Sequence, residues 1–232
     1  MPDRAGVRVA TWNLQWKGPR SPAASAIDQR LRRFEAQVAV LTEVRWPMLK
    51  LWRYQELAGG DRYPGTPEDG VKVAIASDLP MARKPLPVSD ELLVRNTVVV
   101  DVDLGEGVTP LRVIGIVVRW NAIAAYLERL RAVLPELVVP DRTVVAGDFN
   151  LTVPGGRRSG ELLEVLGASG LTVRTGDEHG ALRGERRLRD HLAVSREIGV
   201  AGREFWPRCD PGYRDGAAEI TDHAAAAVTL EI

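Results

Sequence analysis

The amino-acid sequence predicts a protein of packed β-sheets that helices cover from outside. Many short apolar runs are rich in β-branched residues and bounded by turn-forming residues, which is typical of strands. Only a few segments carry apolar residues at helical spacing. The 232 residues are enough to bury a large core, and no linker or repeat divides them, so we expect one domain over residues 1–232. Many strands with few helices favour sheets packed on each other.

The predicted strands are spread over the whole chain. They cover residues 7–12, 38–42, 71–77, 92–103, 111–118, 143–146, 171–173, 191–195 and 225–232. Their Val, Ile and Thr side chains suit a pleated and half-buried surface. We therefore expect these segments to supply most of the core.

Three helices are predicted between the strands. In the first, Ser25 and Asp28 are placed as a capping box. Its apolar stripe is Ile27, Leu31, Phe34 and Val38. The second begins at Asn121, which is a good N-cap residue, and the third runs from about residue 159 to residue 166.

Composition limits the classes of function. Lys and Arg (31) balance Asp and Glu (31), so the formal net charge is zero. This argues against a protein that grips long duplexes by counterion release alone, although a local cationic groove remains compatible with it. The single cysteine, Cys209, is expected to be inert and fits a reducing cytoplasm. No apolar run is long enough to span a membrane, so we expect no membrane partner and find no sign of an obligate protein partner.

Polar residues gather at the ends of the predicted strands. Three strands finish in polar residues: Asn13, Glu43 and the segment Gly147-Asp148-Phe149-Asn150. Two others begin with an acid and a histidine: Asp190-His191 and Asp222-His223. In antiparallel sheets the end of one strand lies beside the start of its neighbour. All five segments are therefore expected to meet along one edge of the sheets.

Such a cluster of acids needs a compensating charge. Carboxylates in a cleft repel one another and are poorly solvated. Carboxylate and amide oxygens are hard ligands that suit Mg²⁺, with Mn²⁺ as an alternative. No Cys/His spacing favours a structural zinc. The sequence thus predicts a divalent-metal site at this edge.

Six segments in this order resemble the endonuclease/exonuclease/phosphatase superfamily. They are Thr11-Trp12-Asn13, Leu41-Thr42-Glu43, the run 70–77, Gly147-Asp148-Phe149-Asn150, the run 189–195 and Thr221-Asp222-His223. They span nearly the whole chain, and together they are far more specific than any one alone. The resemblance implies an α/β four-layer sandwich, in which two mixed and mainly antiparallel sheets lie face to face between helices.

The resemblance also implies roles for the site residues. Glu43 would be the principal metal ligand, Asn13 would contact metal or phosphate beside it, and Asp222 would complete the metal site. Asp148 would activate the attacking water, which Asn150 would help to hold. His223 would stabilise charge on the phosphate, and Asp190 would fix its tautomer and favour its cation. The list of predicted site residues is Asn13, Glu43, Asp148, Asn150, Asp190, Asp222 and His223.

Each segment also has a simpler interpretation when taken alone. Asp148 and Asn150 suit a turn, and Asp222-His223 suits a polar strand entry. Asn13 can tie down a loop, and Glu43 can pair with Arg45. We expect His191 to pack or hydrogen-bond at the sheet edge, and His179 to be solvated.

One departure from the family concerns the end of the predicted strand 111–118. Many relatives carry His or Tyr there, whereas this chain has Arg119 and Trp120. Arg119 is a permanent cation and is expected to contact phosphate instead. Trp16, Trp120 and Trp206 are expected to face the substrate, where Trp16 and Trp120 would stack on a base or sugar, and Trp12 is expected in the core.

Three functions are compatible with these residues. We expect a divalent-metal-dependent phosphodiester hydrolase, with nucleic acid as the favoured substrate, that uses water activated by Asp148. A hydrolase of small phosphoesters or phospholipid head groups is the alternative that the zero net charge favours. A catalytically silent binding module of the same fold is the third, supported only by the missing His or Tyr.

Overall fold

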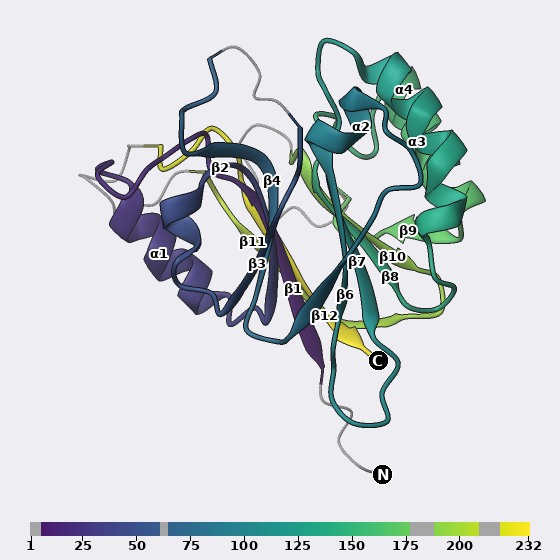
Figure 1. The fold of residues 1–232 in the computed structure, drawn as a ribbon, viewed down its shortest axis with the longest axis horizontal. Helices are drawn as coiled ribbons and strands as arrows, with labels where there is room; N and C mark the ends of the chain where they lie inside the picture. The colour runs from purple at the N-terminus through teal and green to yellow at the C-terminus, as the bar shows by residue number, and fades with distance from the viewer. Residues whose placement is uncertain (1–5, 61–64, 177–187, 209–218) are drawn as a thin grey trace.

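The computed structural model describes residues 6–60, 65–176, 188–208 and 219–232. Two six-stranded β-sheets pack face to face (Figure 1). The first sheet consists, in order, of β11 (Gly199–Trp206), β12 (Ala225–Glu231), β1 (Val7–Asn13), β2 (Val38–Arg45), β4 (Gly70–Ser77) and β3 (Tyr54–Leu57). The second consists of β5 (Met81–Lys84), β6 (Thr97–Val102), β7 (Leu111–Val117), β8 (Thr143–Asp148), β10 (Asp190–Ser195) and β9 (Leu171–Val173).

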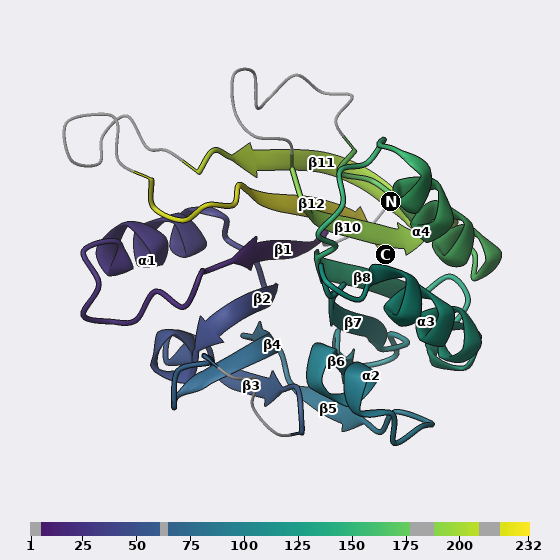
Figure 2. The same ribbon diagram turned by 90° about the horizontal axis from the view of Figure 1, so that it is seen from above.

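Helices cover the outer faces of both sheets. Helix α1 (Ala24–Arg33) lies on the first sheet, and α2 (Glu91–Asn96), α3 (Ile123–Leu137) and α4 (Arg157–Ala168) lie on the second (Figure 2). A 3-10 helix, Trp46–Leu49, follows β2. Within the described residues, no helix combines the length and the apolar character needed to cross a membrane.

Neighbouring strands are antiparallel except at the centre of each sheet. There β1 pairs with β2, and β7 pairs with β8, in parallel. The other strand pairs are antiparallel. The predicted fold class, an α/β four-layer sandwich of two mixed and mainly antiparallel sheets, is therefore confirmed.

The central strands are buried on both faces, which explains why their sequences read as continuous apolar runs. Successive side chains of a strand point to opposite faces. In β8, Val144 packs between the two sheets, whereas Val145 packs under α3 and α4. In β1, Val9 packs between the sheets and Trp12 packs against α1. Trp12 is fully buried, so the prediction that it belongs to the core is confirmed.

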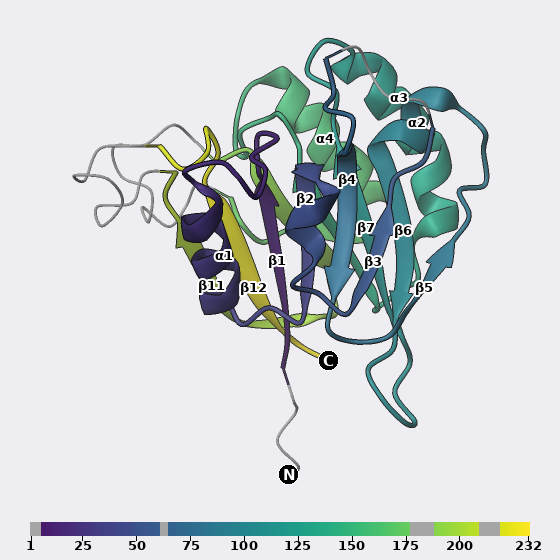
Figure 3. The same ribbon diagram turned by 60° about the vertical axis from the view of Figure 1, so that its left-hand side comes forward.

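The two parallel pairs bring strand ends to one edge of the sandwich. Carboxyl ends of parallel neighbours lie together, so Asn13 pairs with Thr42 and Val117 pairs with Asp148 (β1 and β2 are side by side in Figure 3). Strand β10 starts at this edge, where Asp190 lies opposite Asp148. A hydrogen bond of 2.9 Å from Asn13 to Asp148 joins the two sheets there. The predicted convergence of polar strand ends is thus observed.

Some predicted boundaries were wrong. Residues 92–96 form the end of α2 rather than the start of a strand, because the side chain of Asp90 accepts a hydrogen bond from the amide of Leu93 and caps a helix. Strand β6 begins only at Thr97. Helix α4 begins two residues earlier than expected, at Arg157.

The predicted helix caps were also wrong. The residue before α1 is Ala23, which has no side-chain cap, and Ser25 lies inside the helix. Oγ of Ser25 accepts instead from the side chain of Gln29 on the surface. Ala122, not Asn121, precedes α3, again without a side-chain cap. The packing of apolar stripes, rather than capping, therefore sets where these helices begin.

Strands β3, β5 and β11 were missed, and all three are edge strands. Their residues are mostly half-buried or exposed, and β5 contains Arg83 and Lys84. Charged side chains are common on sheet edges because they discourage pairing with other chains. Such strands lack the apolar signal that revealed the central ones.

Gly147, directly before Asp148, allows an unusually close approach between β7 and β8. Its φ is +139°, and a Cβ placed on it would lie 1.9 Å from the carbonyl oxygen of Ile116. L-residues with a side chain rarely adopt this conformation. The end of β8 therefore requires glycine at this position.

We expect Gly147→Ala to lower the free energy of unfolding by at least about 3 kcal/mol, because the methyl group meets backbone and the dihedral angle is strained. Urea denaturation would measure this. The matched control is Gly160→Ala in α4, where a Cβ meets nothing within 4 Å, and which should stabilise by up to about 1 kcal/mol. A Gly147→Ala protein as stable as the wild type would contradict this account.

Candidate active site

Three buried ionisable side chains meet at the edge where the strand ends converge: Asp148, Asp190 and His223. One potential ligand atom of each lies within 4.8 Å of the other two. Asp148 and Asp190 are direct neighbours on β8 and β10, and like charges placed opposite each other are unfavourable. Nδ1 of His223 donates to Oδ2 of Asp190 at 2.5 Å. The histidine thus supplies positive charge to a pair of acids.

Burial and mutual contact shift the proton affinities of this cluster. Burial, followed by the neighbouring charge of Asp190, raises the pKa of Asp148 to about 7. Burial would lower the pKa of His223, but the carboxylate of Asp190, with smaller contributions from Asp148 and Asp222, outweighs burial and raises that pKa to about 9. Burial also raises the pKa of Asp190, against the attraction of His223. At neutral pH we therefore assign an imidazolium–carboxylate pair to His223 and Asp190, with Asp148 close to its own titration point.

Hydrogen bonds fix the carboxylate of Asp148 in place. Oδ1 accepts from the backbone N–H of Asn150 at 2.8 Å, and Oδ2 accepts from the side-chain amides of Asn13 and Asn150 at 2.9 and 3.1 Å. Asn150 has φ +50°, a conformation that asparagine tolerates. Its amide also donates to the carbonyl of Val118 at 2.9 Å. The turn that was one interpretation of Asp148 and Asn150 is present, and it serves to orient the acid.

Asn13 has two protein contacts in addition to its predicted role beside the metal site. Its amide nitrogen is bound to Asp148, and its Oδ1 accepts from the backbone N–H of Gln15 at 2.8 Å. An amide oxygen has two lone pairs, so one remains available for a further contact. The main visible contact of Asn13 is with Asp148 across the sheets.

Trp12 holds the segment that carries His223. Its Nε1 donates to Oγ1 of Thr221 at 3.0 Å and to the carbonyl of His223 at 3.1 Å. Oγ1 of Thr221 in turn donates to the same carbonyl at 2.7 Å. The guanidinium of Arg30 lies 5.8 Å from the centre of the Trp12 ring. Trp12 and Thr221 were not singled out as supports of the site, although both lie in the motif segments.

Glu43 lies at the end of β2 with φ +46° and is partly buried. Nζ of Lys72, from the neighbouring strand β4, donates to its Oε1 at 2.7 Å. The same ammonium group lies 4.9 Å from the centre of the Trp16 ring. The pairing of Glu43 with Arg45 is wrong, because Arg45 donates to Asp69 at 2.6 Å. Lys72 is a site residue that was missed, and its sequence signal is a single charge inside the apolar run 70–77.

Asp222 borders the cluster from the more exposed side. Its side chain is 37% exposed, and its Oδ1 lies 4.0 Å from Nε2 of His223. The two ring nitrogens of His223 therefore face different acids: Nε2 faces Asp222, and Nδ1 is hydrogen-bonded to Asp190. Asp222 thus lies next to the outer side of the histidine.

A groove borders the cluster, and we call it the Trp120 groove. Its lining residues are Glu43, Lys72, Asn96, Val117, Arg119, Trp120, Asn121 and Asn150. Trp120 is 72% exposed. The structure thus places Arg119 and Trp120, both predicted to face the substrate, together with Glu43 and Asn150.

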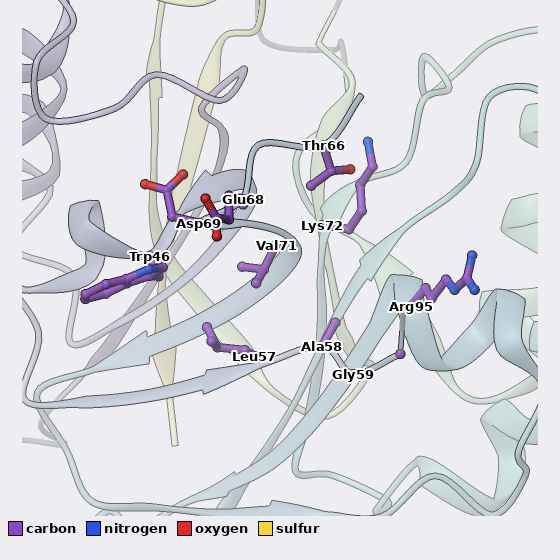
Figure 4. A pocket seen from close by; sticks show the side chains of 12 residues that line it. Trp46, Leu57, Ala58, Gly59, Thr66, Glu68, Asp69, Val71, Lys72 and Arg95 are labelled. Carbon is purple, nitrogen blue, oxygen red and sulfur yellow. The ribbon is translucent and has the colours of Figure 1, made fainter. Parts of the chain in front are cut away.

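A second pocket adjoins the Trp120 groove, because Lys72 lines both. Figure 4 shows Lys72 and Arg95 on one side of this pocket, with Trp46, Glu68 and Asp69 on the other. It extends the accessible surface beyond Glu43 towards strands β3 and β4. No motif in the sequence had indicated this pocket.

The other aromatic predictions have mixed outcomes. Trp16 is partly buried and packs closely on Gly70 beside Lys72, so its ring is already in contact with protein. Trp206 is also partly buried, and its ring packs 5.0 Å from that of Phe34 and against Arg30. Buried His191 hydrogen-bonds to Thr175 and to the carbonyl of Leu151, as expected of a packed residue. The predictions of an inert Cys209 and a solvated His179 concern residues outside the described part of the chain.

Comparison with solved structures supports the fold. The endonuclease domain of TRAS1, a telomere-specific non-LTR retrotransposon, is similar with a TM-score of 0.67 and 21% identity over 97% of this chain and 98% of that one. TDP2 of D. rerio, humanized by 14 mutations, is similar with a TM-score of 0.69 and 16% identity over 98% of this chain and 100% of that one. D. rerio TDP2 complexed with a single-strand DNA product has a TM-score of 0.67 and 16% identity over 98% of this chain and 100% of that one. No curated protein matches the sequence significantly.

The family model described as "Endonuclease/Exonuclease/phosphatase family" matches residues 10–223. This range runs from the middle of β1 to His223 and contains the strand ends that form the site. The resemblance predicted from the motif segments is therefore confirmed over nearly the whole chain. The protein belongs to the endonuclease/exonuclease/phosphatase family.

Proposed function

We propose that the protein is a divalent-metal-dependent phosphodiester hydrolase that acts on nucleic acid. The observation that carries the proposal is the buried cluster of Asp148, Asp190 and His223 beside an open groove. Members of the family are generally hydrolases. The cluster combines a base that titrates near neutral pH with a fixed cation, which suits attack of water on a phosphodiester.

The donor atoms near the cluster fit a hard cation such as Mg²⁺, or Mn²⁺. Two buried carboxylates face one imidazolium, and Oδ1 of Asp190 is buried without a hydrogen-bond partner among the described residues. We assign the metal to Glu43 with Asp222 and the remaining lone pair of Asn13. His223 is not a ligand in this assignment, because its Nδ1 is bound to Asp190. A bound cation would offset negative charge on the phosphate oxygens.

Asp148 orients the attacking water and takes up its proton. A pKa of about 7 is well matched to a base that works near neutral pH. The three donated hydrogen bonds hold its carboxylate in one orientation, so little reorganisation is needed at the moment of reaction. As water attacks phosphorus, the bond to the leaving oxygen breaks. Asn150 holds the water or a phosphoryl oxygen.

His223 stabilises the charge that grows on the phosphate. Its imidazolium is favoured by Asp190, which binds Nδ1 and leaves the Nε2 hydrogen available for a phosphoryl oxygen. Asp190 acts through His223 as a positioning residue. Arg119 adds a permanent cation in the groove.

The exposed Trp120 favours nucleic acid over other phosphodiesters, because every base offers a flat face for stacking. We prefer Trp120 to Trp16 for this role, since the Trp16 ring already contacts Gly70 and Lys72. The zero net charge favours the second candidate, a hydrolase of small phosphoesters or phospholipid head groups. A silent binding module is the third outcome.

We expect Asp148→Asn to lower Mg²⁺-dependent hydrolysis of bis-p-nitrophenyl phosphate about 10²–10⁴-fold, because the isosteric amide cannot accept the proton. Steady-state kinetics would measure it. Asp28→Asn, on the surface of α1, is the matched control and should retain wild-type activity. If the wild type hydrolyses no diester with Mg²⁺ or Mn²⁺, the silent binding module is the better description.

We expect the metal affinity to depend on Glu43. Glu43→Gln removes one anionic ligand and should weaken Mn²⁺ binding about 10–100-fold. Isothermal titration calorimetry on protein stripped with EDTA would measure this without turnover. Glu56→Gln, on strand β3 and away from the cluster, should bind Mn²⁺ like the wild type. Equal affinities of Glu43→Gln and wild type would remove Glu43 from the metal site.

The charge of His223 should depend on Asp190. In metal-free protein the imidazole should stay doubly protonated until the pH approaches its pKa of about 9. In Asp190→Asn the pKa should fall, because burial is then offset only by the carboxylates of Asp148 and Asp222. Histidine ¹⁵N NMR over a pH titration would report both values, with His223→Gln used for assignment. A His223 that is neutral at pH 7 in the wild type would contradict the assigned pair.

A further inference from the structure

A second groove begins on the other side of Asn150. We call it the arginine groove, and its lining residues are Asn150, Leu151, Thr152, Gly156, Arg157, Arg158, Ser159 and Arg189. Asn150 lines both this groove and the Trp120 groove. The two grooves therefore meet beside Asp148, which Asn150 contacts directly.

The arginine groove concentrates positive charge in a chain whose net charge is zero. None of the described residues that line it is acidic. Arg158 and Arg189 are exposed, and neither side chain forms an ion pair or hydrogen bond within the part of the chain that the structure describes. Among the residues that the structure describes, Arg157 forms an ion pair only with Glu161, at 3.4 Å, and 89% of its side chain is exposed.

Two other arginines of the protein are used differently. Arg112 donates to Asp101 at 2.5 Å, and Arg129 donates to Asp90 at 2.7 Å. Those guanidinium groups stabilise the fold through internal acids. The arginine groove instead offers guanidinium donors to an external anion.

The backbone under the groove is held firmly. Oγ of Ser159 donates to the carbonyl of Thr152 at 2.7 Å, which ties α4 to the segment after β8. The amide of Phe149 donates to the carbonyl of Arg189 at 2.9 Å. These bonds fix the position of the arginine backbones relative to Asp148. A ligand that binds the arginines is thereby aligned with the catalytic cluster.

We propose that the arginine groove binds a phosphate of the substrate next to the one that is cleaved, so that the substrate is a nucleic-acid strand. The strand would pass from the Trp120 groove across Asn150 into the arginine groove. This inference rests on the proposed function. Guanidinium groups bind phosphate through paired hydrogen bonds, and a small diester has no second phosphate to offer them.

The test compares the double variant Arg158→Ala/Arg189→Ala with a control of equal charge, Arg33→Ala/Arg53→Ala, whose exposed arginines belong to the side of the first sheet. Fluorescence anisotropy with a labelled single-stranded DNA measures binding, with Asp148→Asn added to each protein to prevent cleavage. We expect Kd to rise at least about 10-fold in the double variant and less than 2-fold in the control. The slope of log Kd against log salt should decrease by about 0.7, since the groove contacts one phosphate and each such contact contributes about 0.7.

Kinetics with intact Asp148 complete the test. In the Arg158→Ala/Arg189→Ala variant, kcat/KM should fall for both substrates or for DNA alone. The factor by which it falls for the DNA should be at least about 10 times the factor for bis-p-nitrophenyl phosphate. Equal falls for both substrates, unchanged DNA binding, or binding of anionic phospholipid vesicles in place of DNA would overturn the arginine groove. A wild type that binds DNA through these arginines but hydrolyses no diester would overturn the proposed hydrolase and leave the groove standing. Circular dichroism and Tm would confirm that the variants are folded.

Discussion

The site depends on the electrostatic compensation of two buried acids. The pairing of β8 with β10 forces Asp148 and Asp190 to lie opposite each other in an apolar sandwich. Two carboxylates in such a setting are stable only with nearby positive charge. His223 provides part of it from the other sheet, so the contact that relieves repulsion also holds the sheets in register. The stability of the fold and the proposed chemistry therefore both require that His223 lies beside Asp148 and Asp190.

The surrounding structure meets this demand with neutral supports. Trp12 occupies the outer face of β1, yet its indole N–H reaches the segment that carries His223. Asn13, the next residue, points to the opposite face and binds Asp148. Alternation along one strand thus lets neighbouring residues fix both halves of the cluster. A short stretch of β1 positions the base and the cation relative to each other.

Sequence patterns predict where strands end more readily than they predict which residues the side chains contact. Asp148, Asp190 and His223 were predictable because each adjoins an apolar strand, and the order of their segments matches a family. The contact of Lys72 with Glu43 depends on the register of β2 and β4, which no local pattern specifies. The hydrogen bond from Asn13 to Asp148 depends on the closeness of the facing sheet, which no local pattern specifies either. Edge strands were missed because their apolar signal is weak, and the predicted helix caps were wrong because packing rather than capping sets where α1 and α3 begin.

The choice of substrate is a separate property from the chemistry of the cluster. Any phosphodiester that reaches Asp148 meets the same base and the same imidazolium, so the cluster discriminates little between a strand and a small ester. Discrimination requires contacts that the smaller molecule cannot make. Such contacts lie outside the buried cluster, on surfaces that Asn150 joins. Because exposed side chains of those surfaces, such as Trp120, Arg158 and Arg189, contribute little to the core, they can change without disturbing the compensated acids on which the fold depends.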